Sequence, residues 1–370
     1  MLSDLVIQGF RGIRTMSMSD CGVVNLVVGR NDSGKTSLLE AIRLLMSGDP
    51  RHLRRVHQRI GGRTQTSSES RYVLAFYNRL ETNQIEVGGT FDEIKIDATA
   101  KISEVRRSEQ LLINIDEESE ESEDSLLEPG KQVEVKVTAG KEWVSLSVPI
   151  VESASLYGAR QEFPPTRRSF SKGEFPKLPS PVWLGTNRME SVSLARRYSK
   201  VYRSGGTEAL VKVLATIEPS IEGLVVLTES RERPASLTPL AVLEVKLAGQ
   251  PSFPLENMGE GFSSIIAIVT AIATSDKGLC LLDEMENGIH YSILSQVWSA
   301  AIETALSYDS QIWATTHSFD CISAAYEAFC SRPDLLRVHR MERRDDGEIE
   351  VHTFDHEMLG RALERGLEVR

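Results

Sequence analysis

The chain has 370 residues, of which 41% are hydrophobic and 26% are charged, and its formal net charge at pH 7 is −11. These values are ordinary for a globular protein and allow one large domain or two smaller lobes. The acidic balance argues against a protein that coats nucleic acid. However, seven of the nine residues at 116–124 are acidic and supply much of that charge. We expect this acidic run to be a solvated loop.

Membrane, secreted and zinc-binding classes are not indicated. The longest apolar stretch, residues 265–273, is too short to span a bilayer and predicts a core helix. The chain opens on a strand-like segment, residues 2–10, without a basic and then apolar leader. The cysteines lack paired spacing, so neither a zinc site nor a disulfide framework is expected; they are Cys21, Cys280, Cys321 and Cys330. We therefore expect a cytoplasmic protein without a membrane partner.

A phosphate-binding loop follows, between two regular elements. Residues 23–28 predict a buried strand, and residues 37–46 predict an amphipathic helix. The glycines of the intervening loop let backbone N–H groups close around phosphates at a helix N-terminus. Lys35 can reach the β- and γ-phosphates, and the Thr36 hydroxyl can ligate Mg²⁺. The sequence therefore predicts a nucleoside triphosphate site built from Asn31, Asp32, Ser33, Gly34, Lys35, Thr36 and Ser37.

The middle of the chain changes pattern. Apolar and polar residues alternate at 84–87, 93–96, 132–137 and 143–148, which predicts antiparallel strands with one solvated face. Five prolines at 164–181 mark an extended connection, and residues 182–184 predict a short strand. The stretch from Ser191 to about Leu227 has a mostly helical pattern.

Two apolar strands near the C-terminal end finish in polar side chains. Residues 278–282 lead into Asp283 and Glu284, and residues 312–316 lead into His317. Buried parallel strands deliver their last side chains to the ligand edge of a sheet, so we expect Asp283 in a Mg²⁺ shell and Glu284 as general base. His317 could contact the γ-phosphate and hold the attacking water. Upstream, residues 254–264 place glycines at a helix start, which is a weaker anion-site signal.

The order of these motifs resembles the ATP-binding-cassette (ABC) type of ATPase. The motifs are the phosphate loop, the run Asn257-Met258-Gly259-Glu260-Gly261, the Asp283-Glu284 strand and the strand that ends at His317. This type is shared by structural-maintenance-of-chromosomes (SMC) proteins, the recombination mediator RecF and the overcoming-lysogenization-defect (OLD) nucleases. Residues 7–13 and 283–290 resemble the OLD-like group of AAA-type ATPases best. Residues 50–240 match only in general layout.

The resemblance implies an α/β fold: an ABC-type ATPase head with a mixed central sheet, an antiparallel β subdomain and a helical subdomain. We place an N-terminal ATPase lobe with the phosphate loop and antiparallel strands at 1–150. A proline-rich connection and helical subdomain follow at 151–240. The C-terminal ATPase lobe, with the signature, the Asp-Glu strand and the switch histidine, then occupies 241–370.

The resemblance also implies roles for individual residues. ATP and Mg²⁺ are held by Lys35, Thr36 and Asp283, with Glu284 as catalytic base and His317 as switch histidine. The signature would cap ATP bound to a second subunit through Asn257, Gly259 and Glu260. Residues 287–290 would face the other subunit of a homodimer or higher homo-oligomer, and Arg11 would contact the nucleotide.

Two signature positions depart from the family's pattern. Asn257 replaces the usual Ser, and Met258 replaces the next Gly. An Asn amide can still donate to a γ-phosphate, but activation across the dimer could be weaker. The glutamine-bearing loop that joins the two lobes in this family is not placed by the sequence, and Gln161 and the region of Asn187 are its candidates.

Many OLD-like proteins continue into a metal-dependent TOPRIM nuclease with a strand-ending Glu and a downstream Asp-x-Asp. The residues after His317 hold no such pattern, and Asp345-Asp346 falls in a predicted hairpin turn. We therefore expect a slow, stand-alone ATPase. It would act as sensor or regulator for a separate effector protein, in bacterial anti-phage defence.

Two alternatives stay open. The first is a RecF-like repair ATPase that binds DNA. Residues 196–203 interleave cations with tyrosines, as phosphate-binding and base-stacking surfaces do, and further cations lie nearby at Arg160, Arg167, Arg168 and Lys172. The second is a nucleotide-switched scaffold with little turnover, which would use the same nucleotide-site residues.

Overall fold

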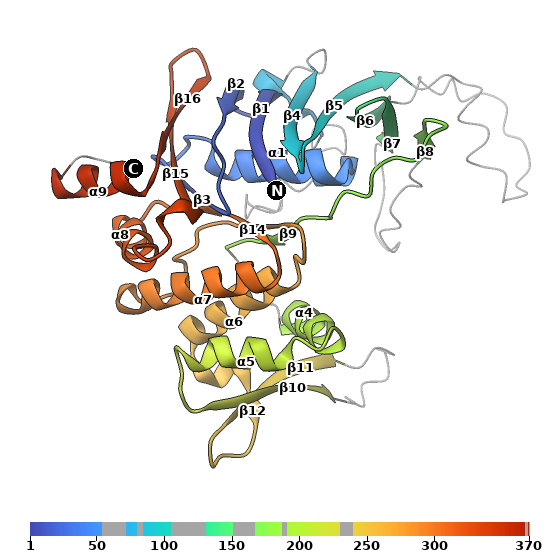
Figure 1. Ribbon diagram of the computed structural model, residues 1–370. Coiled ribbons are helices and arrows are strands. Elements are labelled where there is room, and N and C mark those ends of the chain that lie inside the picture. The colour runs from blue at the N-terminus through green and yellow to red at the C-terminus, as the bar shows by residue number, and fades with distance from the viewer. Residues whose placement is uncertain are drawn as a thin grey trace, which may run out of the picture.

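Two sheets and several helices make up the fold (Figure 1). The computed structural model describes residues 1–53, 72–79, 84–104, 131–150, 167–186, 191–229, 240–366 and 369. Within these ranges, thirteen strands form one large mixed sheet and three form a smaller sheet. The predicted α/β fold with a mixed central sheet is therefore confirmed. The acidic run at 116–124, and Arg160, Gln161 and Asn187, lie outside the described residues.

The parallel part of the large sheet carries the predicted motif strands. In spatial order it contains β9 (Val182–Leu184), β13 (Leu279–Leu282), β14 (Gln311–Thr315), β3 (Val24–Val28) and β15 (Leu336–Arg343). Each of these strands pairs in parallel with its neighbours. Consequently β3, β14 and β13 end side by side at one edge, as the sequence predicted. Strand β16 (Glu348–Phe354) then turns back against β15 through the predicted hairpin turn at 345–346.

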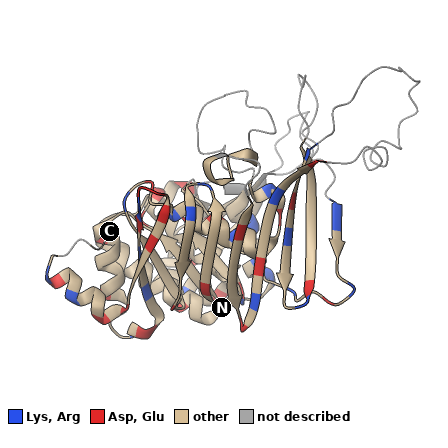
Figure 2. Ribbon diagram, turned by 90° about the horizontal axis from the view of Figure 1, so that it is seen from above, with Lys and Arg blue, Asp and Glu red and all other residues tan. Residues whose placement is uncertain are grey.

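The antiparallel part continues the same sheet without a break. Its order is β2 (Ile13–Met18), β1 (Leu2–Phe10), β4 (Ile85–Phe91), β5 (Ile94–Glu104), β6 (Lys131–Ala139), β7 (Glu142–Ile150) and β8 (Arg167–Phe170). Alternate side chains of β6 are buried, which confirms the predicted period-two pattern. Basic and acidic residues are interspersed along these strands (Figure 2). The antiparallel region is thus an extension of the core sheet.

The large sheet separates two hydrophobic cores. Along β13, Cys280 and Leu282 face one core while Leu279 and Leu281 face the other. Helix α1 (Lys35–Ser47) packs on the second side, under β1, β4 and β5 (Figure 1). The other side holds α6 (Glu260–Ala273), α7 (Leu294–Ser307) and α8 (Phe319–Ala328). Most of α6 is buried, as predicted for residues 265–273, and none of the described helices is long and apolar enough to cross a membrane.

A second lobe packs α4 (Ser191–Arg203) and α5 (Thr207–Ala215) on a small antiparallel sheet. Its strands are β10 (Ile221–Glu229), β11 (Leu240–Leu247) and β12 (Phe253–Pro254). The helical prediction up to about Leu227 was therefore wrong from Ile221 onward. The β-branched residues Val225 and Val226 favour a strand, and β11 supplies a pairing partner distant in sequence that the local pattern could not reveal.

Short elements complete the chain. The 3₁₀ turns are η2 (Tyr77–Arg79), η3 (Leu255–Met258), η4 (Tyr291–Ile293) and η5 (Pro333–Leu335), and α9 (His356–Glu364) ends the described helices. Helix α9 packs against α8 and β15. Turn η3 leads directly into α6 and carries the first part of the signature, residues 257–261.

Candidate nucleotide-binding site

The phosphate loop, residues 29–36, joins the carboxyl end of β3 to the first turn of α1. Every residue of β3 is buried, and α1 begins at Lys35 after Gly34, whose φ is 98°. Gly29 has φ 149°, and a Cβ there would lie 2.6 Å from the carbonyl oxygen of Met341 and 2.7 Å from Oγ of Ser33. Only glycine fits this close approach of backbone segments. The predicted strand–loop–helix unit is confirmed.

Lys35 lies across the loop that precedes it. Its Nζ donates to the carbonyl oxygens of Gly29 at 2.6 Å and Arg30 at 2.9 Å. Burial lowers the pKa of Lys35, and nearby carboxylates act in the opposite direction, Glu286 most strongly and Asp283 next. The ammonium group therefore stands between backbone acceptors and an acidic strand edge. This is where a triphosphate would need a cation.

A small hydrogen-bonded cluster lies below the loop. Oγ1 of Thr36 donates to Oδ1 of Asp283 at 3.0 Å, and Oγ1 of Thr315 donates to the same oxygen at 2.9 Å. The backbone N–H of Glu284 in turn donates to Oγ1 of Thr315 at 2.9 Å. Asp283 is only 2% exposed, so the two hydroxyls fix a buried carboxylate. The structure thus joins the strand ends of β13 and β14 to the start of α1.

The residues present fit a Mg²⁺ ion with a triphosphate. Thr36 and Asp283 supply a hydroxyl and a carboxylate, the oxygen donors that Mg²⁺ prefers. In the loop, Oγ of Ser33 is buried and has no hydrogen-bond partner among the described residues. A phosphate oxygen would satisfy such a donor. The predicted metal ligands are therefore brought together.

Glu284 and His317 lie beyond the two strand ends. Glu284 is half-buried, with φ 52°, and its backbone is held by Thr315. The His317 side chain is 55% exposed, and both its backbone N–H and its Nδ1 lie within 3.3 Å of Oε1 of Glu286. Thr315 and Glu286 were not predicted as site residues. Their signal was available, because Thr315 is the last residue of its strand and Glu286 follows the predicted base by two residues.

The signature starts α6 and packs against residues 287–290, which we call the dimer-facing loop after the role that the resemblance predicts for them. Gly259 has φ 88°. A Cβ on Gly261 would lie 3.2 Å from the carbonyl oxygen of Gly288, and a Cβ on Gly288 would lie 2.9 Å from Oγ of Ser264. These close approaches bring the signature and the dimer-facing loop together in one surface. The proposed contacts of Asn257, Gly259 and Glu260 with ATP of a second subunit stay predictions.

Sequence comparisons match the two parts of the chain that carry the candidate site. Residues 1–142 match the family described as "AAA ATPase domain", and residues 191–320 match the one described as "AAA domain, putative AbiEii toxin, Type IV TA system". In structure, an SMC head bound to the C-winged helix domain of ScpA has a TM-score of 0.50, with 15% identity, over 99% of both chains. Both matched families are AAA families, and the fold resembles that of an SMC head. The predicted ABC/SMC kind of ATPase is supported, while the OLD-like group stays a prediction.

Two further likenesses are more distant or more local. The SMC head with an extended coiled coil from Pyrococcus furiosus is 12% identical over 98% of both chains, with a TM-score of 0.47. Uncharacterized protein MJECL10 of Methanocaldococcus jannaschii is 38% identical over 47 residues. That match covers 13% of this chain and 22% of the relative. The chain therefore spans about a fifth of the length of the curated relative that it matches.

Arg11 lies beside the phosphate-loop helix of this SMC-like head. It occupies the turn between β1 and β2 with φ 54°, and its guanidinium forms an ion pair with Glu40 of α1. The same group lies 5.2 Å from the centre of the Phe10 ring. These contacts tie the first hairpin to α1. The predicted contact of Arg11 with the nucleotide stays a prediction.

Only some side chains of the basic segment of α4, residues 196–203, are exposed. Tyr198 is 2% exposed and its hydroxyl donates to the carbonyl oxygen of Leu224 at 2.7 Å, so it cannot stack on a base. Arg196, Lys200 and Arg203 are exposed and recur at helical spacing along one face. The predicted interleaving of cations and tyrosines is therefore corrected to a stripe of three cations, with Tyr202 exposed beside it.

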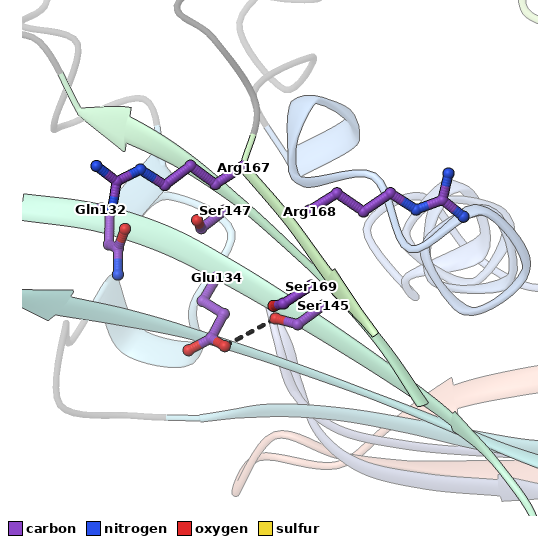
Figure 3. Close-up of a pocket in the computed structure, with 7 residues that line it drawn as sticks. All are labelled: Gln132, Glu134, Ser145, Ser147, Arg167, Arg168 and Ser169. Atoms are coloured by element: carbon purple, nitrogen blue, oxygen red, sulfur yellow. Dashed lines mark hydrogen bonds between the residues drawn. The ribbon is translucent and has the colours of Figure 1, made fainter. Parts of the chain in front are cut away.

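A separate concavity of about 440 Å³ lies on the solvated face of β6, β7 and β8 (Figure 3). Glu134 accepts a hydrogen bond from Oγ of Ser145 at 2.7 Å within it. Arg167 and Arg168 follow each other on β8 and point in opposite directions in the view. The other lining residues are Gln132, Ser147 and Ser169. The concavity has mixed charges and lies on the antiparallel strands, whereas the nucleotide motifs lie at the ends of the parallel strands.

Proposed function

We propose that this chain binds ATP with Mg²⁺ and hydrolyses ATP slowly, giving ADP and phosphate. The observation that carries the proposal is the cluster of Thr36, Asp283 and Thr315 directly below the phosphate loop, with Glu284 held beside it by Thr315. A phosphate-binding loop alone supports binding only. The adjoining carboxylates add the groups that orient and deprotonate a water molecule.

The residues divide the chemistry among them. Backbone N–H groups of the loop and the Lys35 ammonium hold the phosphates and neutralise their charge. Thr36 and Asp283 would hold Mg²⁺, which would offset charge that develops on the phosphates in the transition state. Glu284 accepts the proton of the attacking water as general base. His317 lies two residues after β14 with its side chain 55% exposed, and it would hold the attacking water.

We further propose that two copies close around ATP, so that the signature of one copy caps the nucleotide of the other. Support comes from the surface beside the dimer-facing loop. Tyr291 is 66% exposed directly after this loop, and Phe319, two residues after His317, is 45% exposed. Large exposed aromatic side chains of this kind mark protein interfaces. A second copy would cover both of them.

The cellular role that we propose is that of a cytoplasmic sensor or regulator in anti-phage defence, acting on a separate effector protein. This follows the OLD-like resemblance of residues 283–290. The match of residues 191–320 to an AAA domain family described with a type IV toxin–antitoxin system supports a role in defence. Intrinsic, ATP-independent DNA cleavage by the purified protein would contradict this role.

A RecF-like DNA-binding ATPase is the second candidate function. The observation in its favour is the exposed stripe of Arg196, Lys200 and Arg203 on α4. Three cations on one face can follow a phosphate backbone, and their binding would weaken steeply with salt. A salt-sensitive, ATP-dependent affinity for duplex DNA without a protein partner would favour this function. Loss of that affinity in the triple Ala variant would assign it to the stripe.

The first experiment measures the mass of purified Glu284→Gln protein with and without ATP and Mg²⁺, with short duplex DNA in parallel. An ATP-driven shift from monomer to dimer supports the composite site, and DNA co-migration then supports the second candidate. A constant monomer mass contradicts closure around ATP. Multiple-turnover hydrolysis by the wild-type protein would separate an ATPase from a nucleotide-switched scaffold with little turnover.

A further inference from the structure

Glu286 acts on two predicted site residues, His317 and Lys35. It follows β13 by four residues and its side chain is only 13% exposed. Its Oε1 accepts the backbone N–H of His317 at 3.2 Å and lies 3.3 Å from Nδ1 of the same residue. One carboxylate oxygen therefore fixes both the backbone and the ring of the switch histidine.

The other carboxylate oxygen of Glu286, Oε2, is buried and has no hydrogen-bond partner among the described residues. Of the nearby carboxylates, Glu286 raises the pKa of Lys35 most strongly. A buried carboxylate with one unsatisfied oxygen costs free energy of folding, so stability alone does not explain its presence. Glu286 instead contacts the switch histidine and acts electrostatically on the phosphate-binding lysine.

We propose that Glu286 is a positioning residue for ATP hydrolysis, which holds His317 with Nδ1 protonated and leaves the lone pair of Nε2 to accept a hydrogen bond from the attacking water. The inference rests on the proposed function. In a neutral imidazole, the hydrogen bond at one nitrogen decides which nitrogen carries the proton. The His317 ring is more than half exposed, so without Glu286 it would sample several rotamers and both tautomers. Glu286 acts through the histidine and not on the substrate.

Kinetics of four variants test this role: Glu286→Ala, Glu286→Gln, His317→Ala and the Glu286→Ala/His317→Ala double variant. We expect Glu286→Ala to lower kcat about tenfold or more, while affinity for a non-hydrolysable ATP analogue changes by less than about threefold. Gln keeps an oxygen that can accept both N–H groups, so Glu286→Gln should recover most of kcat. In the His317→Ala background, Glu286→Ala should add little further loss.

A spectroscopic measurement tests the same contact without turnover. The protein is labelled with ¹⁵N-histidine, and the signal that disappears in His317→Ala identifies His317. We expect a protonated Nδ1 in the wild-type protein and in Glu286→Gln, and a shift toward the Nε2-protonated form in Glu286→Ala. Glu303→Gln, which alters an exposed carboxylate of α7 that pairs with Arg332, serves as control and should change neither readout.

Three results would overturn the inference. One is an additional loss of about tenfold or more when Glu286→Ala is added to His317→Ala, because Glu286 would then act independently. Another is an unchanged His317 tautomer in Glu286→Ala, and the third is a Glu286→Gln variant that is folded but as inactive as Glu286→Ala. If the wild-type protein lacks ATPase activity, the proposed function fails, whereas the tautomer measurement still judges the contact.

Discussion

Thr36 donates its hydroxyl to Oδ1 of Asp283 at 3.0 Å, although 247 positions separate the two residues in the chain. Thr36 lies in the first turn of α1, and Asp283 directly follows β13. Because β3, β14 and β13 are neighbours in the sheet, their ends bring the two residues together. The fold therefore places the two proposed metal ligands within hydrogen-bond distance of each other.

Lys35→Ala should abolish ATP binding. The change removes the only side-chain ammonium assigned to the phosphates and also the two hydrogen bonds that hold the loop at Gly29 and Arg30. We expect the Kd for ATP to rise about a hundredfold or more, with a smaller change in Tm. Isothermal titration calorimetry measures the first and differential scanning calorimetry the second. Lys246→Ala, at an exposed ion pair with Glu222, should leave the Kd unchanged.

Glu284→Gln should retain ATP binding and lose hydrolysis. Gln keeps the volume of the side chain but cannot accept a proton from water, so kcat should fall about a hundredfold or more, while the Kd for ATP stays within about threefold. Single-turnover kinetics and equilibrium binding measure the two quantities. Hydrolysis at the wild-type rate would show that another group is the base.

Thr315→Val should disturb the metal site through Asp283. The variant loses the hydroxyl that donates to Asp283 and accepts the N–H of Glu284, so one buried acceptor and one donor lose a partner. We expect a loss of about 1–3 kcal/mol in the free energy of unfolding and a higher Mg²⁺ requirement for turnover. Urea titration and a Mg²⁺ titration of the rate measure these effects.

The neighbouring Thr316 offers a matched control. It is also fully buried, but its hydroxyl accepts the N–H of Ser318 and does not contact Asp283. Thr316→Val should therefore lower stability without raising the Mg²⁺ requirement. An equal rise in the Mg²⁺ requirement for both variants would show that loss of stability, rather than the bond to Asp283, causes the effect.

Stability should decrease as the pH falls below neutrality because of His339. Its ring lies between Asn25 and Thr353, with Nε2 3.2 Å from Oδ1 of Asn25, and burial lowers its pKa from 6.5 to about 4. In the unfolded chain His339 takes up a proton near pH 6.5, whereas in the folded protein its imidazole stays uncharged until about pH 4. Between these values the unfolded state binds more protons, so the free energy of unfolding falls with pH, by at most about 3 kcal/mol.

Urea unfolding at a series of pH values from 7.5 to 4.5 measures this slope. His339→Gln should remove most of it, because glutamine does not titrate, although the variant will be less stable at every pH. His352→Gln, at a half-exposed position on β16, is the control and should keep the wild-type slope. A wild-type slope in His339→Gln would assign the pH dependence to other groups.

Local pattern predicted most of the regular elements. The apolar run at 23–28, the loop glycines and the helix after them became β3, the phosphate loop and α1, because a buried strand and an amphipathic helix are encoded by neighbouring residues. The antiparallel strands were predicted for the same reason. The segment at Ile221–Glu229 was misassigned because its pairing with β11 decides its conformation.

The sequence by itself determined the motif order, the strand ends that carry polar groups and the residue types of a nucleotide site. Only the tertiary structure shows that Thr315 hydrogen-bonds to Asp283 and that Glu286 contacts His317. It also shows that Tyr198 is buried, with its hydroxyl bonded to Leu224. These relationships depend on which strands are neighbours and on their register. A chain's local pattern does not encode either quantity, since both are set by packing between residues that are far apart in sequence.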